Sequence, residues 1–136
     1  MALANYELDL MTHVASGIGS LTLGTNAFAG PLRSAADGAP HLCVGCVLTG
    51  GPVPTELMDG GSSHLHEPSL AITVRSAPDT YQTARDLAES IWEAVHNGAV
   101  TGYQWVRCQQ STPLYAGVDN NRSHYFTINV TMAKVE

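Results

Sequence analysis

The sequence predicts a single α+β domain over residues 1–136: a two-layer sandwich with two helices on one face of a mainly antiparallel sheet. Three observations support this fold class. The chain has 136 residues, which suffice for one well-packed core but hardly for two. Two segments carry apolar residues at helical spacing, and about five carry the alternating or continuous apolar runs of strands. Most strands follow one another through turns, as in antiparallel sheets.

The most regular stretch, Glu67–Gly98, predicts a strand followed directly by a helix. In Leu70–Arg75, large apolar side chains alternate with small or polar ones, the pattern of a half-buried strand. We expect Asp79 to cap the following helix. We also expect Trp92 to lie at the centre of the core. The apolar stripe of the helix consists of Tyr81, Ala84, Leu87, Ala88, Ile91, Trp92 and Val95.

The remaining elements are predicted in the same way. A first helix, Ala4–Ser16, has Asn5 as a candidate cap. A final strand, His124–Val135, shows the clearest alternation, with Phe126, Ile128, Val130 and Met132 pointing inward. Three further segments complete the sheet and its connections: short strand Ala27–Leu32, strand Tyr103–Gln110 and loop Ser111–Asn121.

The segment His41–Thr49 predicts a strand that is apolar on both faces. A strand of this kind is usually covered on both sides. We expect the core to cover one face and a neighbouring subunit to cover the other.

A long segment rich in Gly, Pro and His, Gly50–Pro68, separates the second and third strands. Loops longer than about 12–15 residues in a compact domain are usually functional or disordered. We interpret this one as an arm between two paired strands that reaches a partner or lines an opening. The alternative is a mobile hairpin tip without a role. The candidate contact residues for a partner or lumen are Glu56, Leu57, Met58, Asp59, His64 and His66.

Charge and composition limit the classes of partner. The formal net charge is -6, and no Lys or Arg occurs between Arg33 and Arg75. Such a surface repels phosphate, which argues against a protein that binds the phosphate backbone of nucleic acid. Charged residues make up 13% of the chain, against a typical value of about 25%, which favours burial in a larger assembly. No apolar run reaches the roughly 18 residues of a membrane span, so we predict no membrane partner.

The positions of cysteines and histidines suggest a metal site at first. The geometry of a strand argues against this site. Three cysteines do not form a disulfide framework, which favours a reducing compartment. In a strand, Cys43 and Cys46 point to opposite faces, and His66 and Glu67 also diverge. We therefore predict neither a metal nor another cofactor. The set considered consists of His41, Cys43, Cys46, His64, His66 and Glu67.

No sequence pattern indicates catalysis. The chain contains neither a Gly-x-Ser-x-Gly nucleophile motif nor a glycine-rich phosphate loop, and Cys108 has no local partner. We predict that the protein is not an enzyme.

Three passages, Leu23–Leu32, Pro68–Glu89 and Gln109–Asp119, resemble in this order the tail terminator or minor capsid family of long-tailed, siphovirus-like bacteriophages. In that family a helix reads roughly Tyr-x-x-Ala-x-x-Leu-Ala, as in Tyr81–Ala88. A Ser-x-Pro-x-x-x-Gly-x-Asp loop then precedes the final strand, as in Ser111–Asp119. The resemblance departs at the long segment between the second and third strands, which is longer and richer in Gly and His than in the family.

The resemblance implies a structural protein of the virion tail or neck that is assembled in the host cytoplasm. Such a protein forms a ring, usually of six subunits, that caps the tail tube, stops its elongation and provides the head-joining surface. The implied partners are further copies of the chain, the tail tube protein, and a head connector or neck protein, with DNA only passing through the lumen. No catalytic motif defines this family.

An acidic region without bases suits a channel through which DNA slides. We hypothesise that Glu56 and Asp59 face that channel or the tube. Two alternatives remain: another neck protein, such as a head-closure or connector adaptor, and a small metal-dependent enzyme.

Overall fold

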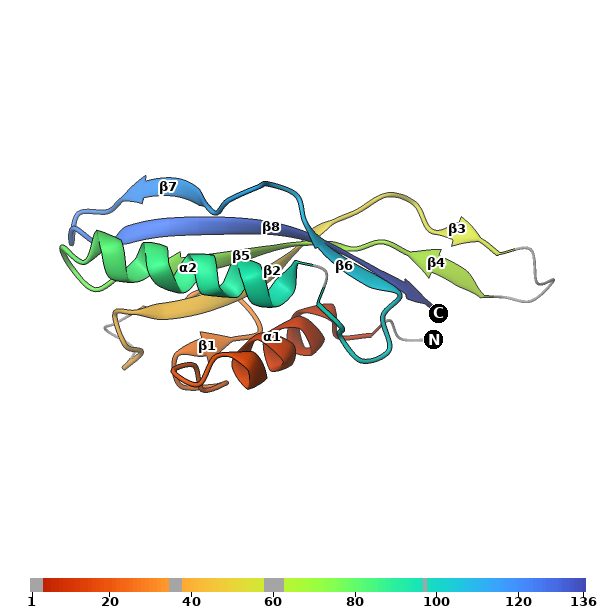
Figure 1. The fold of residues 1–136 in the computed structure, drawn as a ribbon, viewed down its shortest axis with the longest axis horizontal. Coiled ribbons are helices and arrows are strands. Elements are labelled where there is room, and N and C mark those ends of the chain that lie inside the picture. Colours follow the sequence, from red (N-terminus) through yellow and green to blue (C-terminus); the bar gives the residue numbers. More distant parts are fainter. Residues whose placement is uncertain (1–3, 35–37, 58–62, 97) are drawn as a thin grey trace.

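The computed structural model describes residues 4–34, 38–57, 63–96 and 98–136 and shows an α+β fold with two helices and an open, mixed sheet (Figure 1). The expected α+β class with two helices is confirmed, but the sheet is mixed and the described residues form eight strands rather than about five. The elements are α1 (Tyr6–Gly17), β1 (Ala27–Phe28), β2 (Cys43–Gly50), β3 (Thr55–Glu56), β4 (His64–His66), β5 (Ser69–Arg75), α2 (Tyr81–Val95), β6 (Trp105–Cys108), β7 (Leu114–Val118) and β8 (His124–Val135).

The sheet is built on β8, which pairs with four other strands. On one side it runs antiparallel to β5, with Tyr125–Thr131 opposite Ser69–Arg75. On the other side it pairs with β7 and then with β6. Its last two residues pair with β4. Beyond β5, the sheet continues through antiparallel β2 to β1, which is parallel to β2.

The core lies between the helices and one face of this sheet. Val44, Val74 and Phe126 occupy one row across β2, β5 and β8, and all three are buried. α2 packs against β8 and β5, while α1 packs against β2 and α2. The predicted inward residues of the last strand are confirmed as buried. The helices contribute Tyr6, Leu10, Met11, Val14, Ala84, Ala88, Ile91 and Val95.

The two helices begin differently from each other. As predicted, Asn5 caps α1, and its side-chain oxygen accepts a hydrogen bond from the Leu8 amide at 3.1 Å. The predicted cap of α2 was wrong, because the helix begins after Thr80. Asp79 instead has a positive φ of 60°, and its carboxylate accepts a 2.6 Å hydrogen bond from Arg122. This ion pair occupies the carboxylate that we expected at the helix terminus.

Trp92 lies at the edge of the core rather than at its centre. Its indole N–H donates to the Gln110 carbonyl at 2.8 Å, and its ring stacks on His96 with centroids 4.7 Å apart. A buried indole N–H needs an acceptor, which the rim of the core supplies. Smaller side chains such as Ile91 fill the centre.

The expected loop at 111–121 contains β7, a short strand at the sheet margin. Most of its side chains are exposed, and its pairing with β8 is irregular between Tyr115 and Gly117. A mostly exposed, irregular strand lacks the apolar alternation that identifies strands from sequence.

The first half of β2 is covered on its second face by the same chain, whereas coverage of the strand by a neighbouring subunit stays a prediction. The strand is buried from Cys43 to Cys46 and exposed from Val47 onward. A Cβ added at Gly45 would lie 2.8 Å from the Gly30 carbonyl oxygen and 2.9 Å from the Leu32 nitrogen. The segment after β1 therefore crosses directly over this position, and only glycine fits beneath it.

This close approach predicts that Gly45→Ala lowers the free energy of unfolding by about 1–3 kcal/mol, because the new methyl group meets backbone that cannot rotate away. Gly19→Ala is the matched control, since a Cβ there meets nothing within 4 Å. Its effect should stay within about 0.5 kcal/mol. Urea unfolding of both variants checks the prediction, and equal stabilities would contradict it.

Candidate interaction site on the hairpin arm

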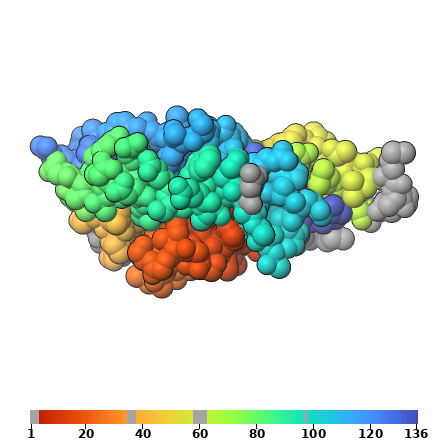
Figure 2. Space-filling model, viewed as in Figure 1, coloured from red at the N-terminus to blue at the C-terminus, as the bar shows by residue number. Residues whose placement is uncertain are grey.

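The segment between β2 and β5 forms a hairpin arm, which we define as residues 51–57 and 63–67. Within it, β3 pairs with β4 through Thr55 opposite Leu65 and Glu56 opposite His64. The prediction of an arm between two paired strands is confirmed, because β2 and β5 pair with each other. The arm itself contains two short strands where we expected irregular chain. Figures 1 and 2 show that it extends beyond both helices along the long axis of the molecule.

The arm is attached to the body through β8. The His64 amide donates to the Glu136 carbonyl at 2.7 Å, and the Glu136 amide donates to the His64 carbonyl at 2.9 Å. At the arm's base, Gly51 has a φ of 140°, and a Cβ there would lie 2.5 Å from the Glu67 carbonyl oxygen. A glycine is therefore required at this point, where the chain entering the arm passes close to the chain leaving it. The arm continues the central sheet.

The candidate contact residues differ in their surroundings. The Glu56 side chain is 89% exposed, and Leu57 is half-buried. His64 and His66 lie on the same side of β4 with their rings 6.4 Å apart, and the His64 Nε2 atom lies 3.9 Å from a Glu56 carboxylate oxygen. The structure therefore brings Glu56, His64 and His66 together on the arm. Two further candidates, Met58 and Asp59, lie outside the described residues.

The base of the arm is fixed to α1 by Ala4, Tyr6 and Glu136, which we call the base latch. The Glu136 carboxylate accepts hydrogen bonds from the Tyr6 hydroxyl at 2.6 Å and the Ala4 amide at 2.9 Å. Partial burial alone would raise the pKa of Glu136, but these two bonds and the nearby His66 and Lys134 lower it below its usual range. Burial, and then the Glu136 carboxylate, raise the pKa of Tyr6.

A second tyrosine supports the base latch. The Tyr103 ring meets the Tyr6 ring edge-on with centroids 6.3 Å apart, and its hydroxyl donates to Asp9 at 2.7 Å. The Lys134 ammonium lies 4.9 Å from the centre of the Tyr103 ring. Burial, and then the bond to Asp9, raise the pKa of Tyr103. These contacts connect α1, the segment before β6 and the end of β8 at the root of the arm.

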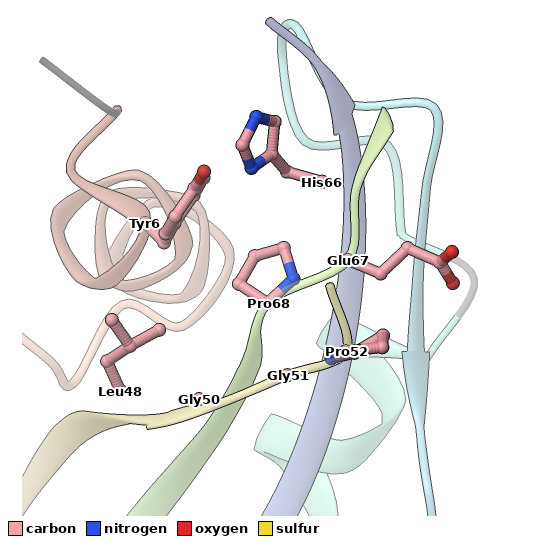
Figure 3. A pocket seen from close by; sticks show the side chains of 8 residues that line it. All are labelled: Tyr6, Leu48, Gly50, Gly51, Pro52, His66, Glu67 and Pro68. Atoms are coloured by element: carbon pink, nitrogen blue, oxygen red, sulfur yellow. The ribbon is translucent and has the colours of Figure 1, made fainter. Parts of the chain in front are cut away.

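A pocket of about 140 Å³ opens between the start of α1 and the root of the arm (Figure 3). Tyr6, Leu48, His66 and Pro68 face this space, whereas the Glu67 side chain points to the opposite side of the strand. Its volume is below the roughly 300–1,000 Å³ typical of small-molecule sites. The pocket suits a single side chain of a protein partner better than a cofactor.

A larger hollow of about 440 Å³, which we call the end pocket, lies where β5 ends and β8 begins. Arg75 is only 8% exposed there, and its Nε and Nη2 atoms donate to the carbonyl oxygens of His41 and Pro40, both at 2.9 Å. Sequence reasoning missed this site, because its residues come from four separate segments. The lining consists of Leu32, Ser34, His41, Arg75, Asp119, Asn121, Ser123 and Tyr125.

Asp119 in the end pocket stabilises the turn at residues 119–123 to which it belongs. Its carboxylate accepts hydrogen bonds from the Tyr125 hydroxyl at 2.8 Å and from the amides of Asn121 at 2.9 Å and Ser123 at 3.0 Å. The bond from Tyr125, followed by that from Ser123, lowers the pKa of Asp119.

The cysteines and the arm histidines of the considered metal set lie on different strands, Cys43 and Cys46 on β2 and His64 and His66 on β4. Cys46 belongs to the core cluster, whereas Cys43 lies opposite Arg75 in the register of β2 and β5. Burial, followed by the charge of Glu7, raises the pKa of Cys46 to about 12. In the described ranges, no three His, Cys, Asp or Glu residues are grouped as metal ligands would be. Within those ranges, neither helix has the length and apolarity needed to cross a membrane.

Comparison of the chain with protein-family models and with curated proteins gave no match. The family resemblance therefore rests on the three passages of sequence. In the structure, these passages contain β1, β5 with the first part of α2, and β7. They surround β2 and β8 and do not include the arm.

The base latch predicts a pH-dependent effect of Tyr6→Phe. Near neutral pH, losing the bond to an ionised carboxylate should cost about 1–2 kcal/mol of unfolding free energy. The pKa of Glu136 is depressed in the folded protein, so this stabilisation exists above the unfolded pKa and disappears as pH falls through the folded pKa. The difference between variant and wild type should therefore shrink at acidic pH.

Urea unfolding near pH 7 and near pH 3 measures this difference. Tyr81→Phe is the control, because the described residues supply no hydrogen-bond partner for the Tyr81 hydroxyl and the residue is 42% exposed. A constant difference between Tyr6→Phe and wild type at both pH values would contradict the role assigned to Glu136.

Proposed function

We propose that the protein is a tail terminator of a long-tailed bacteriophage. It assembles as a ring, with six subunits as the usual number in that family, caps the tail tube and stops its elongation. The upper surface of the ring then receives the head connector or neck protein. The observation that carries this proposal is the hairpin arm: a supported extension of the central sheet that presents exposed side chains away from the body.

Several surfaces support assembly with further copies and with the tube. The second half of β2 exposes Val47 and Leu48, at 39% and 43%. β7 at the other margin of the sheet exposes Leu114, Tyr115 and Val118, at 46%, 49% and 55%. Exposed apolar groups at strand margins are common at sites of protein association. In this proposal each subunit is a two-layer sandwich with its helices on one face of the sheet.

The charge distribution supports a role around a DNA channel. From residue 34 to residue 74 the sequence contains no Lys or Arg, and this range includes the whole arm. A wall without bases does not hold the phosphate backbone of DNA that passes through it. The placement of Asp59 toward that channel or the tube stays a prediction, whereas for Glu56 we replace it below with a contact to a neighbouring subunit.

Electron microscopy of phage particles produced without this gene tests the proposed function. We expect overlong, headless tubes beside intact, DNA-filled heads, because nothing stops polymerisation of the tail tube protein. Supplying the wild-type gene in trans should restore normal tail length, which serves as the control.

Two other results would contradict the proposal. Tails of normal length beside leaking or empty heads would move the function to head closure or to a connector adaptor. Normal virions would show that the protein is not required for virion assembly.

A further inference from the structure

We infer that the hairpin arm of one copy binds the end pocket of a second copy, with Glu56 of the arm facing Arg75 of the pocket. This contact rests on the self-association in the proposed function, and it specifies which surfaces of the chain meet. It also assigns Glu56 to a neighbouring subunit rather than to the channel.

The positions of the two surfaces favour a repeating contact. The arm lies at one end of the long axis, whereas the end of β5 and the starts of β2 and β8 lie at the other (Figure 1). A contact between two different surfaces is heterologous: each bound copy still offers one free arm and one free pocket. Such a contact closes into a ring when the rotation between neighbours permits, and otherwise continues as a filament.

The charges of the two surfaces are complementary. The arm contains Glu56 and Glu67 but no Lys or Arg. In the end pocket, Arg75 as a whole residue is 8% exposed, and its guanidinium donates to two carbonyl oxygens. In the part of the chain that the structure describes, no carboxylate forms an ion pair with it. A buried charge is costly unless it is directly paired, and a carboxylate from a second chain would form such a pair with Arg75.

Asp119 lines the same pocket, and the bond from Tyr125 and, to a smaller extent, the charge of Arg75 lower its pKa, but Asp119 and Arg75 form no ion pair within the described residues. Asp119 uses its carboxylate to bind the Tyr125 hydroxyl and two amides of its own turn. The planar guanidinium of arginine binds a carboxylate through two parallel hydrogen bonds, which sets orientation as well as affinity.

The size and lining of the pocket fit polar side chains of the arm. Its volume of about 440 Å³ holds several side chains, unlike the pocket of about 140 Å³ at the root of the arm. Ser34, His41 and Asn121 in its wall add polar groups around Arg75. The described arm strand β3 is exposed at both of its residues, and the contact that Glu56 would exchange on docking is its 3.9 Å approach to His64.

Native mass spectrometry and analytical ultracentrifugation of purified protein test the contact. We expect oligomers of the wild-type chain, and self-association weakened at least about tenfold by Glu56→Lys, because like charges would then meet at the pocket. Glu93→Lys makes the same charge change on an exposed position of α2 and should leave assembly unchanged. A monomeric wild type, or a Glu56→Lys variant that assembles normally, would overturn the inference.

A mixing experiment separates a direct contact from a general loss of fold. Asn121→Trp should fill the end pocket from an exposed position while leaving Arg75 and its bonds intact. Alone, this variant and Glu56→Lys should each self-associate at least about tenfold more weakly than wild type, although both should melt like wild type. Mixed together, they should form one-to-one dimers, because the mixture contains one functional arm and one functional pocket per pair. A mixture that stays monomeric would contradict the assignment.

These results are independent of the test of tail length. Normal assembly of Glu56→Lys together with overlong tubes in the gene deletion would refute this contact and leave the tail terminator proposal in place. Formation of the mixed dimer together with normal tails in the gene deletion would support this contact and refute the tail terminator proposal.

Discussion

The register of β8 is the constraint on which the rest of the structure depends. This one strand pairs with β4, β5, β6 and β7. Because side chains alternate along a strand, a shift of one residue would turn Phe126, Ile128, Val130 and Met132 away from the helices. The same shift would move the partner positions of Leu65 and His66 at the root of the arm. Core packing and the placement of the arm are therefore determined together.

This coupling gives the arm a fixed direction. A two-stranded hairpin in water is only marginally stable without further support. Here β8 pairs with β4, and the base latch connects the end of β8 to the first turn of α1. The chain thus supplies a preformed extension, and a preformed surface loses less conformational entropy when it binds a partner.

The parts of the fold that the sequence predicted are those in which local patterns and tertiary burial agree. The alternation in Leu70–Arg75 and His124–Val135 corresponds to β5 and β8, and Asn5 caps α1 as expected. Asp79 was assigned wrongly, because its ion pair with Arg122 joins positions far apart in the sequence. No local pattern reports such a contact.

The candidate site was predictable to a similar extent. A long segment rich in Gly and His indicated an arm, and the acidic, base-free composition indicated its charge. The supporting contacts were not predictable, since Tyr6 and Glu136 are 130 positions apart. The end pocket depends on Arg75 meeting carbonyl groups that precede β2, which only the folded register brings together.

The claim that the arm is a supported extension of β8, rather than an independent hairpin, has a direct measurement. Hydrogen–deuterium exchange followed by nuclear magnetic resonance reports the protection of the His64 and Glu136 amides, whose hydrogen bonds join the arm to β8. We expect both amides to be protected well above the unfolded rate, approaching the protection of the amides that join β5 and β8. Exchange of both amides at the unfolded rate, beside a protected β5–β8 pair, would show that the arm moves independently and would contradict this claim.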